Sequence, residues 1–398
     1  MVKKRRVFYV SGFDPKGPLF YHSLYRAEAA KQAAVTGAQI FVENRSGTSA
    51  LAEQWQINAE FDERTVATTY EFLRWDGIIR RHWSRTEWRL FIDLLRTAWL
   101  YIGSGALFRV LLTAWPPFVT ALYPAIFLCL LLGTALGVAI AATLALLTAG
   151  APVLSAYAGG TVGLLGVIYI GRLIERRVNS YWLLRIYAFT AKQALGKVPE
   201  LENRLDAFAR HIVDYLQQAD DDEVLIVGHS TGTLMAVSVL ARALALDPAL
   251  TRHKPRISLL TLGECLPILS FLPQARAFRA ELALVAKATA INWLDFTAPA
   301  DGACFALIDP LAVSRIPRPD GVENHPKILS PRYPKILRPQ TYAKIKRDRY
   351  RMHFQYLMAS ELPGDYDYFA VTAGPLTLAE RFQALPAVRD YSQFKLFP

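Results

Sequence analysis

Cysteine is scarce in this 398-residue chain. The three cysteines, Cys129, Cys265 and Cys304, lie far apart and form no CxxC pair. A disulfide framework or a zinc site needs several cysteines at regular spacing, so we expect neither, and no motif implies a cofactor or another metal. Charged residues make up only 20% of the chain and hydrophobic residues 53%, a balance that excludes a disordered protein and a coiled coil.

Charge is missing altogether from residues 110–171, which contain no Asp, Glu, Lys, Arg or His. About 20 apolar residues cross a bilayer as a helix, and a single helix over this whole run would reach roughly 90 Å. Pro116-Pro117 and Gly150-Ala151-Pro152 divide the run. It therefore predicts two transmembrane helices, at about 120–148 and 152–172, joined by an uncharged turn. The alternative is a buried helical hairpin of a soluble protein.

Basic residues dominate both flanks of this run. Six arginines against two acidic residues occur between Arg80 and Arg109, and five basic residues against Glu175 occur between Arg172 and Lys192. Cytoplasmic flanks carry such an excess, so we expect both ends of the hairpin in the cytoplasm, as for a bacterial-type inner-membrane protein. Aromatic residues typical of membrane interfaces occupy the same flanks: Trp83, Trp88, Trp99, Tyr101, Trp115 and Trp182. The excess of 45 basic over 34 acidic residues is thereby assigned to membrane lipids and not to nucleic acid.

Outside residues 76–199, apolar runs with strand character alternate with helical patterns, which predicts an α/β fold with a mostly parallel sheet flanked by helices. The sheet would combine residues 1–75 with residues 200–398, so both halves lie on one side of the membrane and the crossings are even in number. We expect strands over 6–10, 39–43, 53–62, 65–73, 224–227, 256–262 and 288–296, and helices over 18–36, 200–218, 270–286 and 366–373. One long helix would lead from about Asp76 to the membrane and another back from Arg172 to Leu195.

A G-x-S-x-G motif follows the run Val224-Leu-Ile-Val and precedes a helix of small and apolar residues. A serine on a sharp strand-to-helix turn has an exposed Oγ, and the flanking glycines let neighbouring backbone pack against the turn. The motif predicts Ser230 as a nucleophile in an elbow formed with Gly228, His229 and Gly232. His229 is expected to support the turn by packing and polar contact and not to act as a base.

In this motif the chain resembles the α/β-hydrolase superfamily, over about residues 5–75 and 200–390. The resemblance implies a triad in the order Ser, Asp or Glu, His. Asp301, in a loop after the strand 288–296, is the preferred acid, with Asp295 and Asp309 as alternatives. His353, expected in a late loop before the last helix, is the preferred base, with His325 as the alternative in a solvated loop. The oxyanion hole would use the backbone N–H of Thr231 and that of Gly12 or Phe13, although the chain has no HGGG-type run.

Together these features indicate a membrane-anchored serine hydrolase, of esterase or lipase type, that cleaves an acyl ester derived from lipid. Acyltransferases and thioesterases use the same triad, so they remain alternatives. A second alternative is a hydrolase-like scaffold that binds a membrane partner without turnover. Two crossings without intramembrane charge argue against a transporter or channel.

The expected topology can be tested by cysteine labelling. A membrane-impermeant maleimide added to intact cells should label a cysteine at Ser155, in the turn between the two apolar helices. It should not label one at Ser46, which belongs to the cytoplasmic half. Labelling in the reverse pattern would contradict the assignment from the basic flanks.

Overall fold

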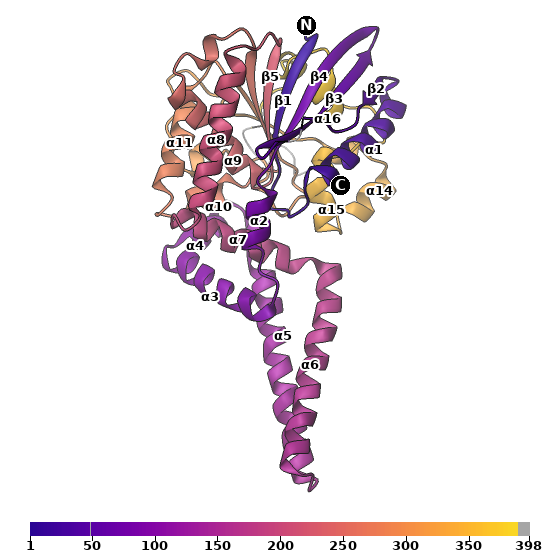
Figure 1. Cartoon of the computed structure of the whole chain (residues 1–398), viewed down its shortest axis with the longest axis vertical. Coiled ribbons are helices and arrows are strands. Elements are labelled where there is room, and N and C mark those ends of the chain that lie inside the picture. Colours follow the sequence, from indigo (N-terminus) through magenta and orange to yellow (C-terminus); the bar gives the residue numbers. More distant parts are fainter. Residues whose placement is uncertain (48, 389–398) are drawn as a thin grey trace.

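The structure, a computed structural model, describes residues 1–47 and 49–388. In this described part of the chain, one eight-stranded sheet has the order β2-β3-β4-β1-β5-β6-β7-β8, and two long helices project from one end of the domain (Figure 1). β3 pairs antiparallel with β2 and with β4, so it runs opposite to the other seven strands. The strands are β1 (Lys4–Val10), β2 (Gln39–Val42), β3 (Ala52–Phe61), β4 (Arg64–Leu73), β5 (Glu223–His229), β6 (Arg256–Leu262), β7 (Asn292–Phe296) and β8 (Lys327–Leu329). The α/β class is therefore confirmed.

The centre of the sheet joins the two halves of the sequence. β1 pairs in parallel with β4 on one side and with β5 on the other. Val7 to Val10 are fully buried, as expected for a central strand covered on both faces. At the start of these strands Arg5 and Glu223, both fully buried, form an ion pair of 2.8 Å, and Arg5 also donates to the carbonyl oxygens of Gly374 and Leu376.

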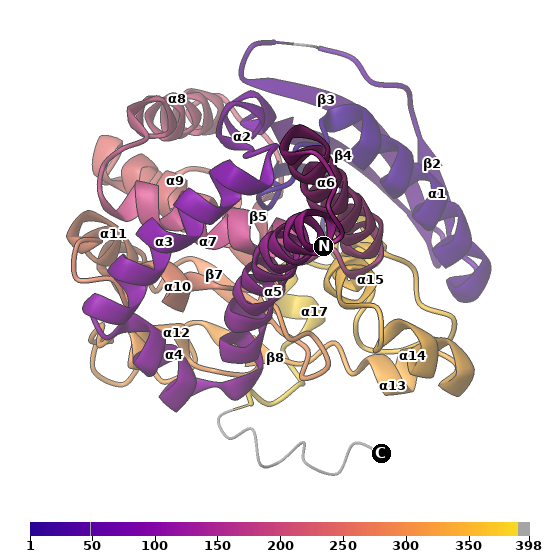
Figure 2. The same cartoon turned by 90° about the horizontal axis from the view of Figure 1, so that it is seen from below.

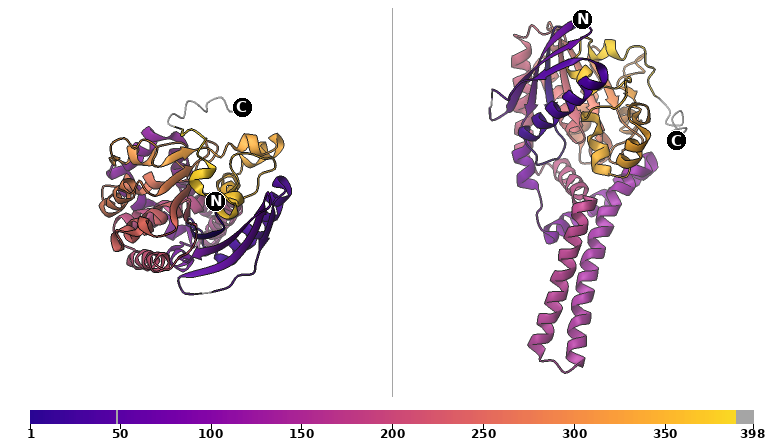
Figure 3. Two further views of the ribbon diagram at one scale, coloured as in Figure 1. Left: turned by 90° about the horizontal axis from the view of Figure 1, so that it is seen from above. Right: turned by 90° about the vertical axis from the view of Figure 1, so that its right-hand side faces the viewer.

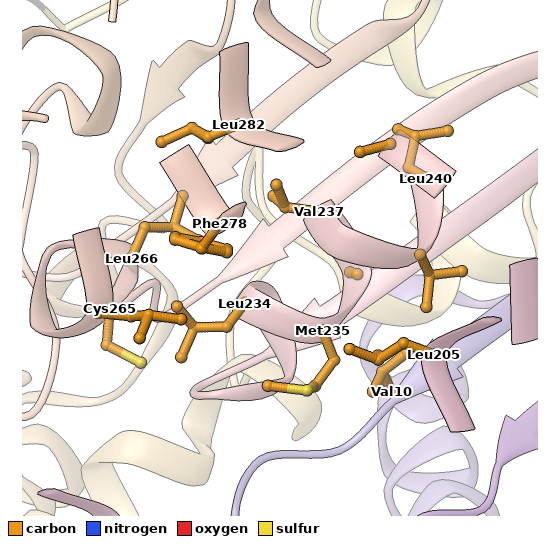
Figure 4. Packing of buried hydrophobic residues seen from close by; sticks show 14 of the residues in the cluster. Val10, Leu205, Leu234, Met235, Val237, Leu240, Cys265, Leu266, Phe278 and Leu282 are labelled. Carbon is orange, nitrogen blue, oxygen red and sulfur yellow. The ribbon is translucent and has the colours of Figure 1, made fainter. Parts of the chain in front are cut away.

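Helices cover both faces of the sheet. One face carries α8 (Pro199–Leu216), α9 (Gly232–Leu246) and α11 (Arg276–Lys287), and Figure 4 shows side chains such as Val10, Leu205 and Met235 packed together there. The other face carries α1 (Pro18–Thr36) and α16 (Tyr368–Ala373), where Tyr9, Tyr25 and Tyr70 pack. Shorter helical elements are η1 (Leu250–Arg252), α10 (Leu266–Ser270), α12 (Pro310–Val313), α13 (Tyr333–Ile336), α14 (Pro339–Ile345), α15 (Arg349–Phe354), η2 (Gln355–Leu357) and α17 (Leu378–Arg381).

The segment between β4 and the apolar run differs from the single long helix expected from Asp76. It forms α2 (Asp76–His82), α3 (Glu87–Gly103) and α4 (Ala106–Thr113). Thr86 caps α3 by accepting from the Arg89 N–H, and Gly105, at φ 74°, separates α3 from α4, which are bent by 73°. Figure 2 shows α3 and α4 lying across the end of the domain from which the hairpin projects. Like α7 (Ser180–Ala194), they contribute buried residues to the core of the domain.

The two projecting helices are α5 (Trp115–Thr148) and α6 (Val153–Val178), and both are long and apolar enough to cross a membrane. This confirms the expected pair of apolar helices. α5 begins earlier than residue 120 because Pro116 and Pro117 fit the first helical turn, where no backbone N–H is needed. The helices pack through small residues: a Cβ at Gly160 would lie 2.1 Å from the Thr143 Oγ1, and one at Gly171 would lie 2.3 Å from the Leu131 Cδ1.

Two other helices expected to be continuous are interrupted. The return helix expected from Arg172 to Leu195 is divided into α6 and α7 at Asn179, whose left-handed backbone has φ 51°. The helix expected over 270–286 begins only at Arg276, as α11, because α10 ends at Ser270 and Pro273 lies in the turn between them.

The aromatic residues of the flanks divide into two groups. Trp88, Trp99 and Trp115 are 66%, 84% and 69% exposed, whereas Tyr101 and Trp182 are buried. The expectation that all of them face the membrane interface is therefore wrong for the last two. The cause is that α3 and α7 each turn one face towards the α/β domain, which the apolar composition of the flanks did not reveal.

Shortening the hairpin should separate its role as an anchor from any role in folding. Leu128 and Leu131 are buried at its base, so we propose replacing residues 137–165 by a short Gly-Ser turn. We expect the domain to keep its intrinsic tryptophan fluorescence, and its free energy of unfolding should stay within about 1 kcal/mol of the parent value, because its core residues are retained. Extraction from membranes by alkaline carbonate should become easier than for the parent chain. Loss of the folded domain would instead show that the distal hairpin is part of the structural core.

Candidate active site

Ser230 stands on the turn between β5 and α9 with a left-handed backbone, at φ 59°. A non-glycine residue in this region is strained, and the Ser230 N–H donates to the Leu262 carbonyl of β6 at 2.9 Å. The two glycines are required by crowding: a Cβ at Gly228 would lie 2.6 Å from the Gly232 oxygen, and one at Gly232 would lie 2.2 Å from the Val10 oxygen. The local geometry is thus that of the strand-turn-helix elbow expected from the motif.

Asp301 and His353 are brought together although they lie in separate segments of the sequence. The His353 Nδ1 lies 2.8 Å from the Asp301 Oδ2, and both side chains are 1% exposed. Burial is the largest single influence and raises the pKa of Asp301. The charge and hydrogen bond of His353, together with hydrogen bonds from Ala303 and Cys304, outweigh it, so the pKa lies below its ordinary value. The Ala303 N–H also donates to Asp301. The carboxylate is therefore held ionised and oriented beside the imidazole.

His353 differs in one respect from its expected setting, because it lies on the short helix α15 and not in a loop. Its Nε2 is buried and has no hydrogen-bond partner within residues 1–47 and 49–388. No hydrogen bond therefore joins it to Ser230 in this structure. Catalytic hydrogen bonds are often long before substrate binds, and a free Nε2 is the atom that a seryl nucleophile requires.

The loop after β1 lies directly against the elbow. A Cβ at Gly12 would lie 2.7 Å from the Ser230 Cβ, so glycine is needed for this approach. The Phe13 N–H donates to the Thr231 Oγ1 at 2.7 Å. This N–H, one of the two considered as the second donor of the oxyanion hole, is therefore already used. The N–H groups of Thr231 and Gly12 remain the pair that we carry forward.

His229 lies beneath the candidate base. Its Nε2 is 2.8 Å from the His353 carbonyl oxygen, and the two imidazole rings are 5.0 Å apart. Burial, with the charge of His353 as a smaller cause, lowers the pKa of His229 to about 3. A neutral His229 donating through Nε2 therefore supports α15, in agreement with the supporting role expected from its place in the elbow.

The alternative triad residues occupy other environments. The Asp295 Oδ1 accepts from the Thr261 hydroxyl at 2.6 Å, and burial raises the pKa of this fully buried carboxyl to about 7. Asp309 caps α12 by accepting from the Leu311 and Ala312 N–H groups. His325 is buried and lies 3.2 Å from the Val285 oxygen, so its expected solvated loop is wrong.

Several neighbours of the site were missed by sequence reasoning. The Trp182 ring lies 5.5 Å from that of His353, and its Nε1–H donates to the Phe13 oxygen at 3.3 Å. A Cβ at Gly263, at φ 57°, would lie 3.3 Å from the His353 Cε1 and 3.4 Å from the Asp301 Oδ2. The signal available for Gly263 was its position at the end of β6. Trp182 was assigned by its position in the sequence to the aromatic residues of the membrane interface, so its place beside His353 was not predicted.

The beginning of α5 also reaches the site. The Thr120 hydroxyl lies 2.7 Å from the Gly302 oxygen, next to Asp301, and Tyr187 of α7 donates to the Pro117 oxygen at 3.3 Å. Ser230 is only 5% exposed. The site is therefore enclosed, and the base of the hairpin forms part of its surroundings.

No family model, curated protein or solved structure matches this chain. Within the described residues, no group of three or more His, Cys, Asp or Glu side chains is arranged to hold a metal ion.

The buried neutral His229 predicts a loss of stability in acid. Between about pH 6.5 and 3 the unfolded chain binds a proton at this residue and the folded chain does not. The free energy of unfolding therefore falls as the pH falls through this range, by about 3 kcal/mol at pH 4. Thermal unfolding in neutral detergent should show this decrease. His229→Gln should be less stable at pH 7 but lose less between pH 6.5 and 4, and an equal loss would contradict the assignment.

Proposed function

We propose that the protein is a membrane-anchored serine hydrolase that cleaves an acyl ester through Ser230, His353 and Asp301. The observation that carries the proposal is the buried 2.8 Å contact between the Asp301 Oδ2 and the His353 Nδ1. His353 also contacts the elbow through His229, the residue before Ser230, and Ser230 has a left-handed backbone. A nucleophile, a base and an orienting carboxylate are the components of acyl transfer by serine. In this function α5 and α6 cross the membrane and hold an α/β-hydrolase domain at its cytoplasmic surface.

The proposed reaction assigns each step to an atom. The His353 Nε2 takes the proton of the Ser230 hydroxyl as the Oγ attacks the ester carbonyl carbon, and the N–H groups of Thr231 and Gly12 stabilise the negative oxygen that forms. His353 then gives the proton to the leaving alcohol, and an acyl-serine remains. Water, deprotonated by His353, attacks this ester, releases the carboxylic acid and restores the serine. Asp301 stays ionised throughout and holds the imidazole by its Nδ1–H.

The surroundings of the site favour a lipid-derived ester. The ring of Trp182 packs against that of His353, and Thr120 at the base of α5 lies beside the acid loop. A site enclosed next to helices that enter the bilayer is close to the acyl chains of membrane lipids. Transfer of the acyl group to an acceptor other than water, or cleavage of a thioester, would use the same residues. A scaffold without turnover is less well supported, since it has no use for a buried imidazole nitrogen without a hydrogen-bond partner.

A fluorophosphonate probe and a panel of acyl esters test the proposal. Detergent-purified protein should bind the probe covalently, whereas Ser230→Ala should not. Turnover should fall by three or more orders of magnitude in Ser230→Ala and His353→Ala, and the double variant should lose little more because the residues act as one unit. Asp301→Asn should lose most activity while remaining folded, since it favours the wrong imidazole tautomer.

His325→Ala and Asp309→Asn are the matched controls, because neither side chain contacts the triad. Both should stay within a few-fold of the parent turnover. Absence of probe labelling in the folded parent protein, or unchanged turnover in His353→Ala, would reject the serine hydrolase mechanism.

A further inference from the structure

A basic segment, residues 335–349, covers α13 to α15 beside the base of the hairpin. Its exposed cationic side chains are Lys335, Arg338, Lys344, Lys346, Arg347 and Arg349. Figures 1 and 2 show α14 and α15 at the end of the domain from which α5 and α6 project. A side view of the same region shows these helices low on the domain, close to where the hairpin begins (Figure 3).

These cations form no ion pair within the part of the chain that the structure describes: none of the six is joined to a carboxylate there. The two acidic residues nearby are used otherwise: Asp348 caps α15 by accepting from the Arg351 N–H, and Glu361 accepts from the Thr341 hydroxyl and from the Arg338 N–H. Unpaired like charges repel one another, so the basic segment is suited to an external anion.

A contact with α5 joins the basic segment to the base of the hairpin. The Arg349 guanidinium lies over the Tyr123 ring of α5, 4.4 Å from its centroid. On the other side of the hairpin, α3 exposes the apolar residues Trp88, Leu95, Trp99 and Ile102 at helical spacing. An apolar helix face and a row of cations beside two membrane-spanning helices are features of a surface that rests on a bilayer.

We infer that the basic segment binds the headgroups of anionic phospholipids in the membrane to which the hairpin anchors the domain. Lysine and arginine side chains near an anionic surface strengthen such binding, and the arginines can also donate two hydrogen bonds to one phosphate. Arg349 and His353 lie one helical turn apart on α15, so bound lipid would hold the helix that carries the candidate base. The inference rests on the membrane insertion proposed above and does not depend on catalysis.

Lipid that copurifies with the full chain provides the test. The protein is reconstituted in vesicles of phosphatidylcholine and phosphatidylglycerol at 9:1, extracted with neutral detergent, washed, and analysed for bound phospholipid. The parent chain and Ser230→Ala should both retain phosphatidylglycerol enriched at least about fivefold over the bulk ratio. A variant with Lys344, Lys346, Arg347 and Arg349 all replaced by Gln should return to the bulk ratio. Because these side chains are exposed, the variant should keep the parent thermal transition.

A matched variant controls for net charge. Lys3, Arg64, Arg252 and Lys287 are also exposed and unpaired within the described chain, and they lie at or near the amino ends of strands, away from the hairpin. Their replacement by Gln removes the same charge and should leave the enrichment intact. The inference is overturned if the parent shows no enrichment or if both variants lose it equally. It is also overturned if inorganic phosphate or a short RNA binds the segment while lipid does not.

Fluorophosphonate labelling of the same samples separates the two proposals. Enrichment without labelling would reject the hydrolase and retain the lipid site, whereas labelling without enrichment would do the reverse.

Discussion

The parallel pairing of β1 with β5 is the constraint on which the rest of the structure depends. It joins strands from the two halves of the sequence, on either side of the apolar run, and fixes their ends at one edge of the sheet. The loop after β1 therefore meets the turn after β5, and Gly12 approaches Ser230. The buried ion pair of Arg5 with Glu223 lies at the opposite end of the same strands. Removing either charge would leave the other buried without its counter-charge, which is more costly than the net stabilisation of the pair.

This pairing also determines what the inserted segment can do. Because β4 and β5 belong to one sheet, the chain must leave the domain and return to it, and the apolar helices form a hairpin. The flanking helices then pack on the domain, so Tyr101 and Trp182 are buried. The insertion thus has helices apolar enough to cross a membrane at its distal end and is part of the core at its base. Thr120, which contacts the Gly302 oxygen beside Asp301, shows how close the two roles are in space.

The charged residues of the molecule fall into a buried group and an exposed group. Asp301, His353 and His229 are buried and are held by specific partners, and the altered pKa values of Asp301 and His229 follow from burial and from neighbouring charge. The cations of the basic segment are exposed and have ordinary surroundings of water and like charge. The first group is suited to chemistry within an enclosed site, and the second to an anionic surface outside the protein.

Local sequence determined the features that depend on neighbours along the chain. The apolar runs specified both long helices, and the pattern Val-Leu-Ile-Val-Gly-His-Ser specified a strand followed by a strained turn at Ser230. Residues 18–36 likewise read as a helix with the observed bounds. Only the tertiary structure decided which side chains meet. The burial of His325 and Asp295 and the position of Trp182 beside His353 depend on contacts between distant segments, and a local pattern carries no record of those contacts.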